Sequence, residues 1–231
     1  MKCWCGGETV DCFHPEYSQC VSCGTFVSNR VTEPGYYDFD HYWRKRGRPN
    51  YVPIDQRAIL DFGDRIPFWG GQLKTIPGCA SILEIGCCHG GFLHYCKDLG
   101  FIRRVGIEIS EGTCDFARKT FGVEMICGEF PNVEINEKFD LVCGFDVLEH
   151  FPKPLDAMRK MKSLGEYVMV QTPCYRGEEM AFPHFKSDEH LFVFNKKSIK
   201  LMFSMAGLTI ISLVRGAFPW DITMVGEVLV G

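Results

Sequence analysis

The chain has 231 residues, of which 46% are hydrophobic, and a formal net charge of −4. This length and composition allow one substantial core with a small appendage, and the acidic balance excludes a global attraction to nucleic acid or to an anionic membrane. No apolar run approaches the roughly 20 residues that span a bilayer. The first residues lack the apolar segment of a secretion signal, so we expect a cytoplasmic protein.

Cysteine is unusually frequent, with 13 residues in the chain. Without a secretion signal, reduced thiols and metal ligands are expected rather than a disulfide framework. Residues 1–30 contain a CGG knuckle at residue 5 and a CxxCG knuckle at residue 20. Four thiolates there would form a closed, structural zinc site, and we expect the ligands Cys3, Cys5, Cys20 and Cys23. Because the first pair has C-x-C spacing, Cys12 or His14 is an alternative for one ligand.

Residues 31–75 read as a connector that is rich in aromatic side chains and includes the basic run RKRGR at 44–48. The basic run is either a solvated face or a site for a substrate phosphate. Apolar residues at helical spacing predict an amphipathic helix over Ile54–Trp69, ended by Pro67. The main domain is expected over residues 76–231.

From residue 81 onward, strand and helix patterns alternate. The predicted strands are Ser81–Ile85, Arg103–Ile109, Val123–Cys127, Phe139–Phe145, Gly165–Thr172, Leu208–Val214 and Thr223–Val230. The predicted helices are Phe92–Leu99, Glu111–Thr120, Pro154–Lys162 and Lys196–Met205. This order predicts an α/β fold with a Rossmann-like, doubly wound, seven-stranded and mostly parallel sheet. The short turn between the last two strands predicts an antiparallel pair at one edge.

The glycine-rich turn in Ser81–Leu93, SILEIGCCHGGFL, follows a buried strand and precedes a helix. Glycines at such a turn allow backbone N–H groups to approach a ligand closely. Glu108 lies near the end of the next strand, where a doubly wound fold places a carboxylate against a ribose diol. Glu129 follows the third strand, near an adenine edge, and Asp146 follows the fourth. A dinucleotide-dependent dehydrogenase would favour G-x-G-x-x-G, and no nicotinamide-side motif is present.

Glu84-x-Gly86-x-x-x-Gly90, Glu108, and the run from Phe139-Asp140 through Glu149-His150 resemble class I S-adenosylmethionine-dependent methyltransferases. The N-terminal part resembles the zinc-knuckle extension of bacterial methyltransferases associated with sugar and surface-glycan modification. The resemblance implies S-adenosylmethionine and structural zinc as cofactors. The residues that it implies for the cofactor site are Glu84, Gly86, Cys87, Cys88, Gly90, Glu108, Ile109, Glu129, Phe145 and Asp146. The family usually has a third glycine where this chain has Cys88, and a Cβ there resists a positive φ.

Methyl transfer to a hydroxyl requires a general base, and histidine has a suitable pKa. The candidates are His150, His184 and His190, with His190 favoured. The last two lie in residues 173–195, an irregular stretch that reads as a lid or substrate loop. Asp146-x-x-Glu149-His150 also resembles the cluster that binds a divalent cation in quinone-precursor O-methyltransferases, where the metal would lower the pKa of a catechol hydroxyl.

We therefore expect a methyltransferase that acts on a small-molecule, sugar or lipid-linked acceptor and methylates an oxygen with a histidine as the base. Carbon methylation of a nucleotide-linked sugar, metal-assisted methylation of a phenolic acceptor and a non-catalytic cofactor-binding module are the alternatives. A nucleic-acid base methyltransferase is disfavoured, because the fourth strand ends in FDVLEH and not in the Asn/Asp-Pro-Pro-aromatic signature. The oligomeric state is not predicted.

Overall fold

The computed structural model describes residues 2–44 and 52–228. Most of the predicted basic run lies in 45–51 and so outside the described residues. The chain divides into two compact units, one made of Met1–Glu33 with Phe145–Gly231 and the other of Pro34–Gly144. The predicted division into an N-terminal module, a connector and a main domain stays a prediction.

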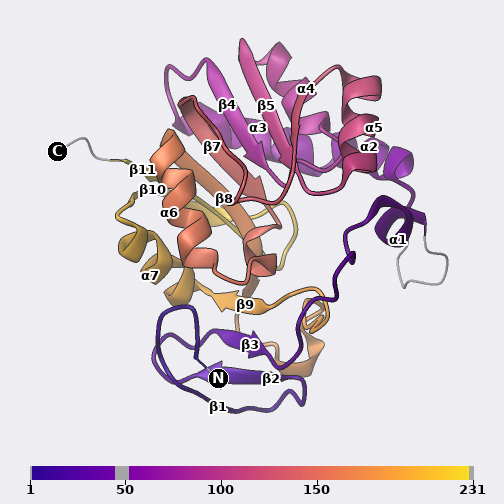
Figure 1. The fold of residues 1–231 in the computed structure, drawn as a ribbon. Helices are drawn as coiled ribbons and strands as arrows, with labels where there is room; N and C mark the ends of the chain where they lie inside the picture. Colours follow the sequence, from indigo (N-terminus) through magenta and orange to yellow (C-terminus); the bar gives the residue numbers. More distant parts are fainter. Residues whose placement is uncertain (1, 45–51, 229–231) are drawn as a thin grey trace. The chain divides into compact units, whose positions relative to one another are not determined.

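The unit Pro34–Gly144 is built on parallel strands. These are β4 (Ser81–Ile85), β5 (Arg103–Glu108), β6 (Glu124–Cys127) and β7 (Phe139–Phe145), in the order β7-β4-β5-β6 (Figure 1). Leu83 on the central strand lies opposite Val105 and Val142, and all three side chains are fully buried. Runs of buried apolar residues are typical of parallel strands, which are covered on both faces. The ends of β4 and β5 therefore lie side by side at one edge of the sheet.

Helices of this unit are α1 (Phe39–Arg44), α2 (Ile54–Gly63), α3 (Arg65–Gln72), η1 (Leu73–Thr75), α4 (Gly91–Asp98) and α5 (Glu111–Phe121). The prediction of one helix over Ile54–Trp69 is wrong. Asp64 caps a second helix with its side chain, which accepts a hydrogen bond from the amide of Arg65. Pro67 therefore lies in the first turn of α3, where the missing N–H costs nothing, and it does not end the helix.

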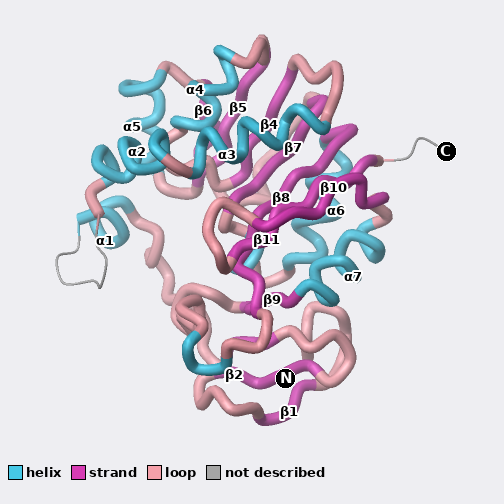
Figure 2. Tube along the Cα trace, turned by 180° about the vertical axis from the view of Figure 1, so that it is seen from behind, coloured by secondary structure: helices cyan, strands magenta, loops and turns pink. Residues whose placement is uncertain are grey.

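The other unit has a mixed sheet. β8 (Gly165–Tyr175) pairs antiparallel with β11 (Asp221–Glu227), and β11 pairs antiparallel with β10 (Thr209–Arg215), which confirms the predicted antiparallel pair. Further along β8, a parallel pairing begins with β9 (Phe192–Asn195). The series continues antiparallel through β3 (Phe26–Ser28), β2 (Tyr17–Cys20) and β1 (Thr9–Asp11). Figure 2 marks β9, β2 and β1 as strands in this part of the chain. The three N-terminal strands are thus joined to β8 through β9.

Helices of this unit are η2 (Leu148–His150), α6 (Pro154–Leu164), η3 (Glu179–Ala181) and α7 (Lys196–Ala206). Asn195 and Ser198 form a reciprocal capping box at the start of α7, and Gly207 ends that helix with φ +76°. A left-handed residue after the last turn is the usual place for glycine. These local signals explain why the predicted helix Lys196–Met205 is close to the observed one.

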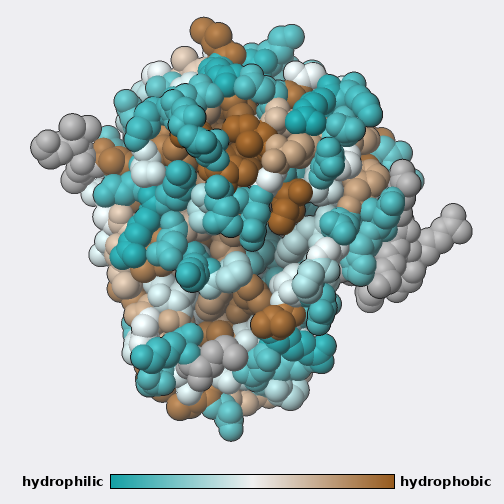
Figure 3. All heavy atoms as spheres, viewed as in Figure 1, coloured by the Kyte–Doolittle hydropathy of each residue, from teal (hydrophilic) through white to brown (hydrophobic). Residues whose placement is uncertain are grey.

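All seven segments predicted as strands contain a strand, whereas the irregular stretch predicted over residues 173–195 is partly wrong. Its first residues continue β8 to Tyr175, and its last form β9. Hydrophilic residues cover much of the face drawn in Figure 3, with apolar side chains between them. Among the described residues, no helix is both long and apolar enough to cross a membrane.

Candidate active site

Three residues of the turn after β4 have a left-handed backbone conformation. Gly86 has φ +65°, Cys88 +51° and Gly90 +77°. The amides of Gly86 and Cys87 donate to the carbonyl of Ile107 on β5, at 2.8 and 3.1 Å. Cys88 adopts the conformation that its Cβ disfavours, and such local strain is found mainly where a site requires it.

Glu84 lies on β4, just before this turn, and is 4% exposed. Its Oε2 is buried and has no hydrogen-bond partner. Burial, and then the charges of Glu108 and Asp61, raise the pKa of the Glu84 carboxyl well above its usual value. An unpaired buried carboxyl is costly, so a cationic ligand group at this point would satisfy Oε2 and lower the pKa.

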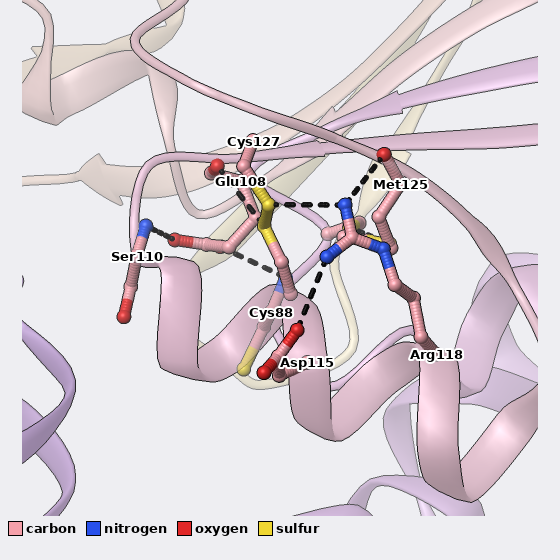
Figure 4. The surroundings of a disulfide bond; sticks show 9 residues. Cys88, Glu108, Ser110, Asp115, Arg118, Met125 and Cys127 are labelled. Atoms are coloured by element: carbon pink, nitrogen blue, oxygen red, sulfur yellow. Dashed lines mark hydrogen bonds and ion pairs between the residues drawn. A yellow bond between two sulfur atoms is a disulfide. The ribbon is translucent and has the colours of Figure 1, made fainter.

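The carboxylate of Glu108, at the end of β5, accepts hydrogen bonds from backbone amides, one of which belongs to the turn after β4. Its Oε2 accepts from the amide of Cys88 at 3.1 Å and its Oε1 from the amide of Ser110 at 3.2 Å (Figure 4). Each oxygen keeps a further lone pair, which suits two adjacent ribose hydroxyls. Burial raises the pKa of this carboxyl, and the backbone amides act in the opposite direction.

A disulfide joins Cys114 on α5 to Cys127 at the end of β6 (Figure 4). The expectation of reduced thiols is therefore wrong for this pair, while the other 11 cysteines form no disulfide. Arg118 donates to the sulfur of Cys127 at 3.3 Å and to the carbonyl of Met125 at 3.0 Å. The cross-link was not apparent from the sequence, because helix and strand bring together two cysteines that are 13 residues apart.

Asp61 on α2, which the sequence analysis missed, is connected to the same turn. Its carboxylate is 3.0 Å from Nε of Arg57, 3.0 Å from Nε of Arg65 and 3.1 Å from Nε2 of His89. Nδ1 of His89 accepts from the amide of Gly91 at 3.0 Å, so Nε2 carries the proton and donates to Asp61. A Cβ at Gly91 would lie 2.7 Å from the His89 ring, so glycine is needed there.

Three other predicted cofactor residues have less specific surroundings. Cys87 is buried, and its Sγ lies 3.7 Å from Sδ of Met125 in the core, so only its backbone faces the turn. Ile109 is 49% exposed beyond the end of β5. Glu129 is exposed and accepts from the side chain of Asn132 at 3.0 Å. None of these contacts tests their predicted roles.

Phe145 and Asp146 belong to the other unit. Phe145 is buried, and Asp146 has φ +52° and accepts from Nε2 of Gln171 at 3.2 Å. Oε1 of Gln171 in turn accepts from the amide of Ala217 at 2.9 Å. Nearby Asp221 is 2% exposed, and burial together with the charge of Asp146 raises the pKa of its carboxyl to about 7. Neither Gln171 nor Asp221 belongs to a recognisable motif.

The three predicted histidines lie close to one another. The rings of His150 and His190 are 4.9 Å apart, and those of His184 and His190 are stacked at 5.8 Å. Nδ1 of His150 is 2.9 Å from the carbonyl of Glu189, and Nδ1 of His190 is 2.9 Å from that of His184. A carbonyl only accepts, so both Nδ1 atoms carry protons, and in a neutral ring the lone pair then lies on Nε2.

Burial and neighbouring charges determine how these groups ionise. Burial, followed by the charge of His150, lowers the pKa of His190 well below its usual value. Burial also lowers the pKa of His184, to about 4, while burial and then the charge of Asp146 raise that of Glu149. A neutral imidazole at neutral pH is the form that can take up a proton or bind a metal.

Glu149, His150 and His190 form a possible metal-ligand cluster, with one ligand atom from each within 4.8 Å of the others. Oε1 of Glu149 is buried without a partner and lies 3.9 Å from Nε2 of His150, while its Oε2 accepts from Thr172 at 2.9 Å. Asp146 is not part of this cluster. The predicted metal ligands were Asp146, Glu149 and His150. In the structure the third residue of the cluster is His190 and not Asp146.

The four N-terminal sulfurs also gather within 4.8 Å of one another, and they belong to Cys3, Cys5, Cys20 and Cys23. The Sγ atom of Cys23 lies 3.7 Å from that of Cys3 and 3.5 Å from that of Cys5, and the Sγ atoms of Cys5 and Cys20 are 3.6 Å apart. A tetrahedral site with zinc–sulfur bonds of about 2.3 Å has edges of about 3.8 Å, so the cluster fits zinc. Cys12 and His14 make other contacts, with the carbonyl of Tyr17 at 3.1 Å and with the amide of Glu16 at 3.2 Å.

Comparisons with known proteins agree with the fold. Residues 43–213 match the family described as a methyltransferase domain. The mitochondrial ubiquinone biosynthesis O-methyltransferase of Dictyostelium discoideum is 20% identical over 127 residues, which are 54% of this chain and 37% of that protein. The chain thus matches little more than a third of the length of that curated relative.

Two solved structures have the same fold. Magnesium protoporphyrin IX methyltransferase of Synechocystis, with bound SAH, has a TM-score of 0.62 at 16% identity, covering 83% of this chain and 96% of that one. DesVI of Streptomyces venezuelae has a TM-score of 0.62 at 18% identity, covering 76% and 97%. The Rossmann-like α/β fold with a mixed sheet is thus the fold of class I methyltransferases. The chain belongs to the methyltransferase-domain family, because the family's model matches residues 43–213.

Proposed function

We propose that this enzyme methylates a hydroxyl oxygen of a small-molecule or glycan-type acceptor and that His190 is the general base. The observation that carries the proposal is the hydrogen bond from Nδ1 of His190 to the carbonyl of His184, at 2.9 Å, in a ring that is 4% exposed. It leaves Nε2 unprotonated in a buried place, as required of a base that takes the hydroxyl proton while oxygen attacks the methyl group. His150 and His184 are the alternative bases.

S-adenosylmethionine, when bound, supplies the methyl group on a positively charged sulfur. Glu84 is suited to the ammonium group of the methionine part, because its Oε2 is buried without a partner. Glu108 would accept from the ribose hydroxyls, and the turn from Gly86 to Gly90 would line the methionine part. Glu129 on the adenine side, and Phe145 with Asp146 beneath the sulfonium, complete the proposed contacts, with Cys87, Cys88 and Ile109 contributing through the backbone.

Structural zinc on Cys3, Cys5, Cys20 and Cys23 is the second part of the proposal. The sulfur–sulfur distances support it, and a site with four thiolates leaves no open position for chemistry. Protein purified without a histidine tag should contain about one equivalent of zinc, and the double variant C20S/C23S should contain none. Zinc retained in that double variant would refute this ligand set.

Cofactor binding is measured first, by calorimetry with S-adenosylmethionine. Failure to bind at millimolar cofactor would contradict every methyl-transfer function. Turnover is then measured as transfer of labelled methyl to phenolic, sugar and lipid-linked hydroxyl compounds. Binding without transfer to any of them would favour a non-catalytic module, and transfer to the carbon of a nucleotide-linked sugar would favour the C-methyltransferase alternative.

The role of His190 is tested with His190→Asn, because the asparagine amide can still donate to the carbonyl of His184 but lacks Nε2. We expect kcat to fall about a hundredfold or more, with cofactor affinity unchanged. His94→Asn is the matched control, since Nδ1 of the exposed His94 also lies 3.1 Å from a carbonyl, that of Phe121. Equal activity of the two variants would remove His190 from the mechanism.

A divalent cation on Glu149, His150 and His190 is a second candidate, favoured by the clustering of their ligand atoms. A cation there would lower the pKa of a phenolic hydroxyl, so the same histidines would act as ligands rather than as a base. Under this alternative His150→Ala should abolish binding of Mn²⁺, which calorimetry measures directly. Full activity without an added cation, in protein that contains only the proposed zinc, would exclude it.

A further inference from the structure

The three N-terminal strands continue directly into the segment that contains the candidate histidines. β3 pairs with β9, with Phe26 opposite Val193 and Val27 opposite Phe192. The amide of Ser28 donates to the carbonyl of Leu191 at 2.9 Å, next to His190. The N-terminal module is thus attached to this segment through backbone hydrogen bonds.

Buried side chains of the module also hold the backbone of residues 187–190. Tyr17 donates from its hydroxyl to the carbonyl of His190 at 2.9 Å, and Ser28 donates to the carbonyl of Ser187 at 2.7 Å. Ser187 returns a hydrogen bond to Glu16, also at 2.7 Å. Tyr17 is 1% exposed and Ser28 and Ser187 are each 3% exposed, so the bonds that Tyr17 and Ser28 donate are shielded from water and costly to lose.

Module and histidine segment also share one hydrophobic cluster. Tyr17 and Phe26 from the N-terminal strands pack with Phe182 and Val193, which flank the histidines in sequence. Phe185 lies 5.1 Å from the ring of Tyr17 and 5.2 Å from that of Phe26. Because side chains of both segments form this cluster, a change in the position of one segment is transmitted to the other.

The cysteine cluster is adjacent to these contacts. Cys20 is the last residue of β2, which begins at Tyr17, and Cys23 lies in the turn that leads to β3. The carbonyl of Cys23 accepts from the side chain of Asn195 at 3.2 Å, at the end of β9. A metal bound by these thiolates would therefore fix the turn between the two strands that contact the histidine segment.

We propose that the N-terminal module holds the histidine segment in its active position, with Tyr17 as a positioning residue for His190 and zinc stabilising the arrangement. This inference rests on the proposed function, because it assigns the module to the acceptor side of the reaction. The Tyr17 hydroxyl contacts the backbone of His190 and not the reacting atoms. Its loss would displace Nε2, and displacements of about 1 Å can cost about a hundredfold in rate.

The test is Tyr17→Phe, which removes only the hydroxyl. Hydrogen exchange of peptides covering residues 184–191 should become at least about tenfold faster, and kcat should fall about tenfold. The dissociation constant of S-adenosylmethionine should stay within about twofold, because none of the proposed cofactor contacts lies in residues 184–191. Tyr167→Phe is the matched control. The hydroxyl of Tyr167 donates to Glu227 at 3.4 Å, and this residue lies near the start of β8, whereas β9 pairs with the end of β8.

The outcomes separate this inference from the proposed function. Unchanged exchange at residues 184–191 in Tyr17→Phe would overturn the inference, whatever happens to turnover. Faster exchange with unchanged kcat would support the holding role of the module and would count against His190 as the base. Faster exchange together with lower kcat supports both.

Zinc is tested separately, in the whole wild-type protein. Removal of the metal by a chelator should speed exchange at residues 184–191 and leave that of peptides over residues 81–93 unchanged. Readdition of Zn²⁺ should restore the original rate. Exchange at residues 184–191 that does not respond to metal removal would refute the part assigned to zinc, while the Tyr17→Phe result still decides the part assigned to the module.

Discussion

At the scale of single residues, burial moves the pKa values of the acids and of the histidines in opposite directions. It raises the pKa of Asp221 to about 7 and lowers that of His184 to about 4. Desolvation disfavours the charged form of either group, so a carboxyl retains its proton and an imidazole loses it. Near neutral pH, the unit that holds the candidate base therefore contains buried groups that are wholly or partly uncharged.

Asp221 makes this effect measurable as a dependence of stability on pH. Between its ordinary pKa of 3.8 and about 7, the folded protein holds a proton that the unfolded chain has released, so stability falls as pH rises. Asp221→Asn lacks this loss and can still accept from the amide of Phe218. Relative to wild type, we expect the variant to gain about 2–3 kcal/mol between pH 5 and pH 8 in urea unfolding. An identical difference at both pH values would contradict the raised pKa.

At the scale of elements, charged side chains on α2 and α3 hold the turn after β4. Asp61 is buried and contacts Arg57, Arg65 and His89, and His89 in turn accepts from the amide of Gly91 at 3.0 Å. This arrangement could not be predicted from the sequence, because the residues that form it are spread from Arg57 to Gly91 and belong to no motif. It depends on the break between the two helices at Asp64.

Asp61→Asn should therefore be strongly destabilising. Removal of one partner from a buried ion pair leaves charges without compensation and costs about 3–5 kcal/mol, which urea unfolding measures. Asp115→Asn on α5 is the control, because Asp115 also contacts two basic residues but is 51% exposed. Asp115→Asn should lower the free energy of unfolding by less than about 1 kcal/mol. A similar decrease in both variants would show that Asp61 is not shielded from water.

The disulfide between α5 and β6 gives a second test at this scale. Thiol titration of the unfolded, unreduced protein should detect 11 thiols, and 13 after reduction. Closure of this short loop stabilises the folded state by about 3 kcal/mol, so Cys127→Ser should lower the stability of the unreduced protein by about that amount. The loss should vanish when both proteins are reduced. Thirteen thiols without reduction would mean that the bond does not form in the isolated protein.

At the scale of the whole molecule, the family assignment predicts that cofactor binding stabilises the fold. A ligand at 100 times its dissociation constant stabilises by about 2.7 kcal/mol, and Tm should rise by roughly 5–10 °C. Glu108→Ala should abolish most of this rise, because the ribose then has no carboxylate acceptor. A full rise in Glu108→Ala would show that the cofactor does not use this residue.

The sequence by itself was sufficient for the α/β alternation, for the turn after β4, for the place of Glu108 at the end of β5 and for the four cysteines that gather near the N-terminus. Those features depend on local patterns: hydrophobic period, glycine at left-handed positions and the spacing of ligands. Only the tertiary structure revealed the contacts of Asp61 with His89, the Cys114–Cys127 bond and the attachment of Tyr17 to His190. Each of these joins residues that are distant in sequence, and a local pattern contains no information about which distant side chains the packed core brings together.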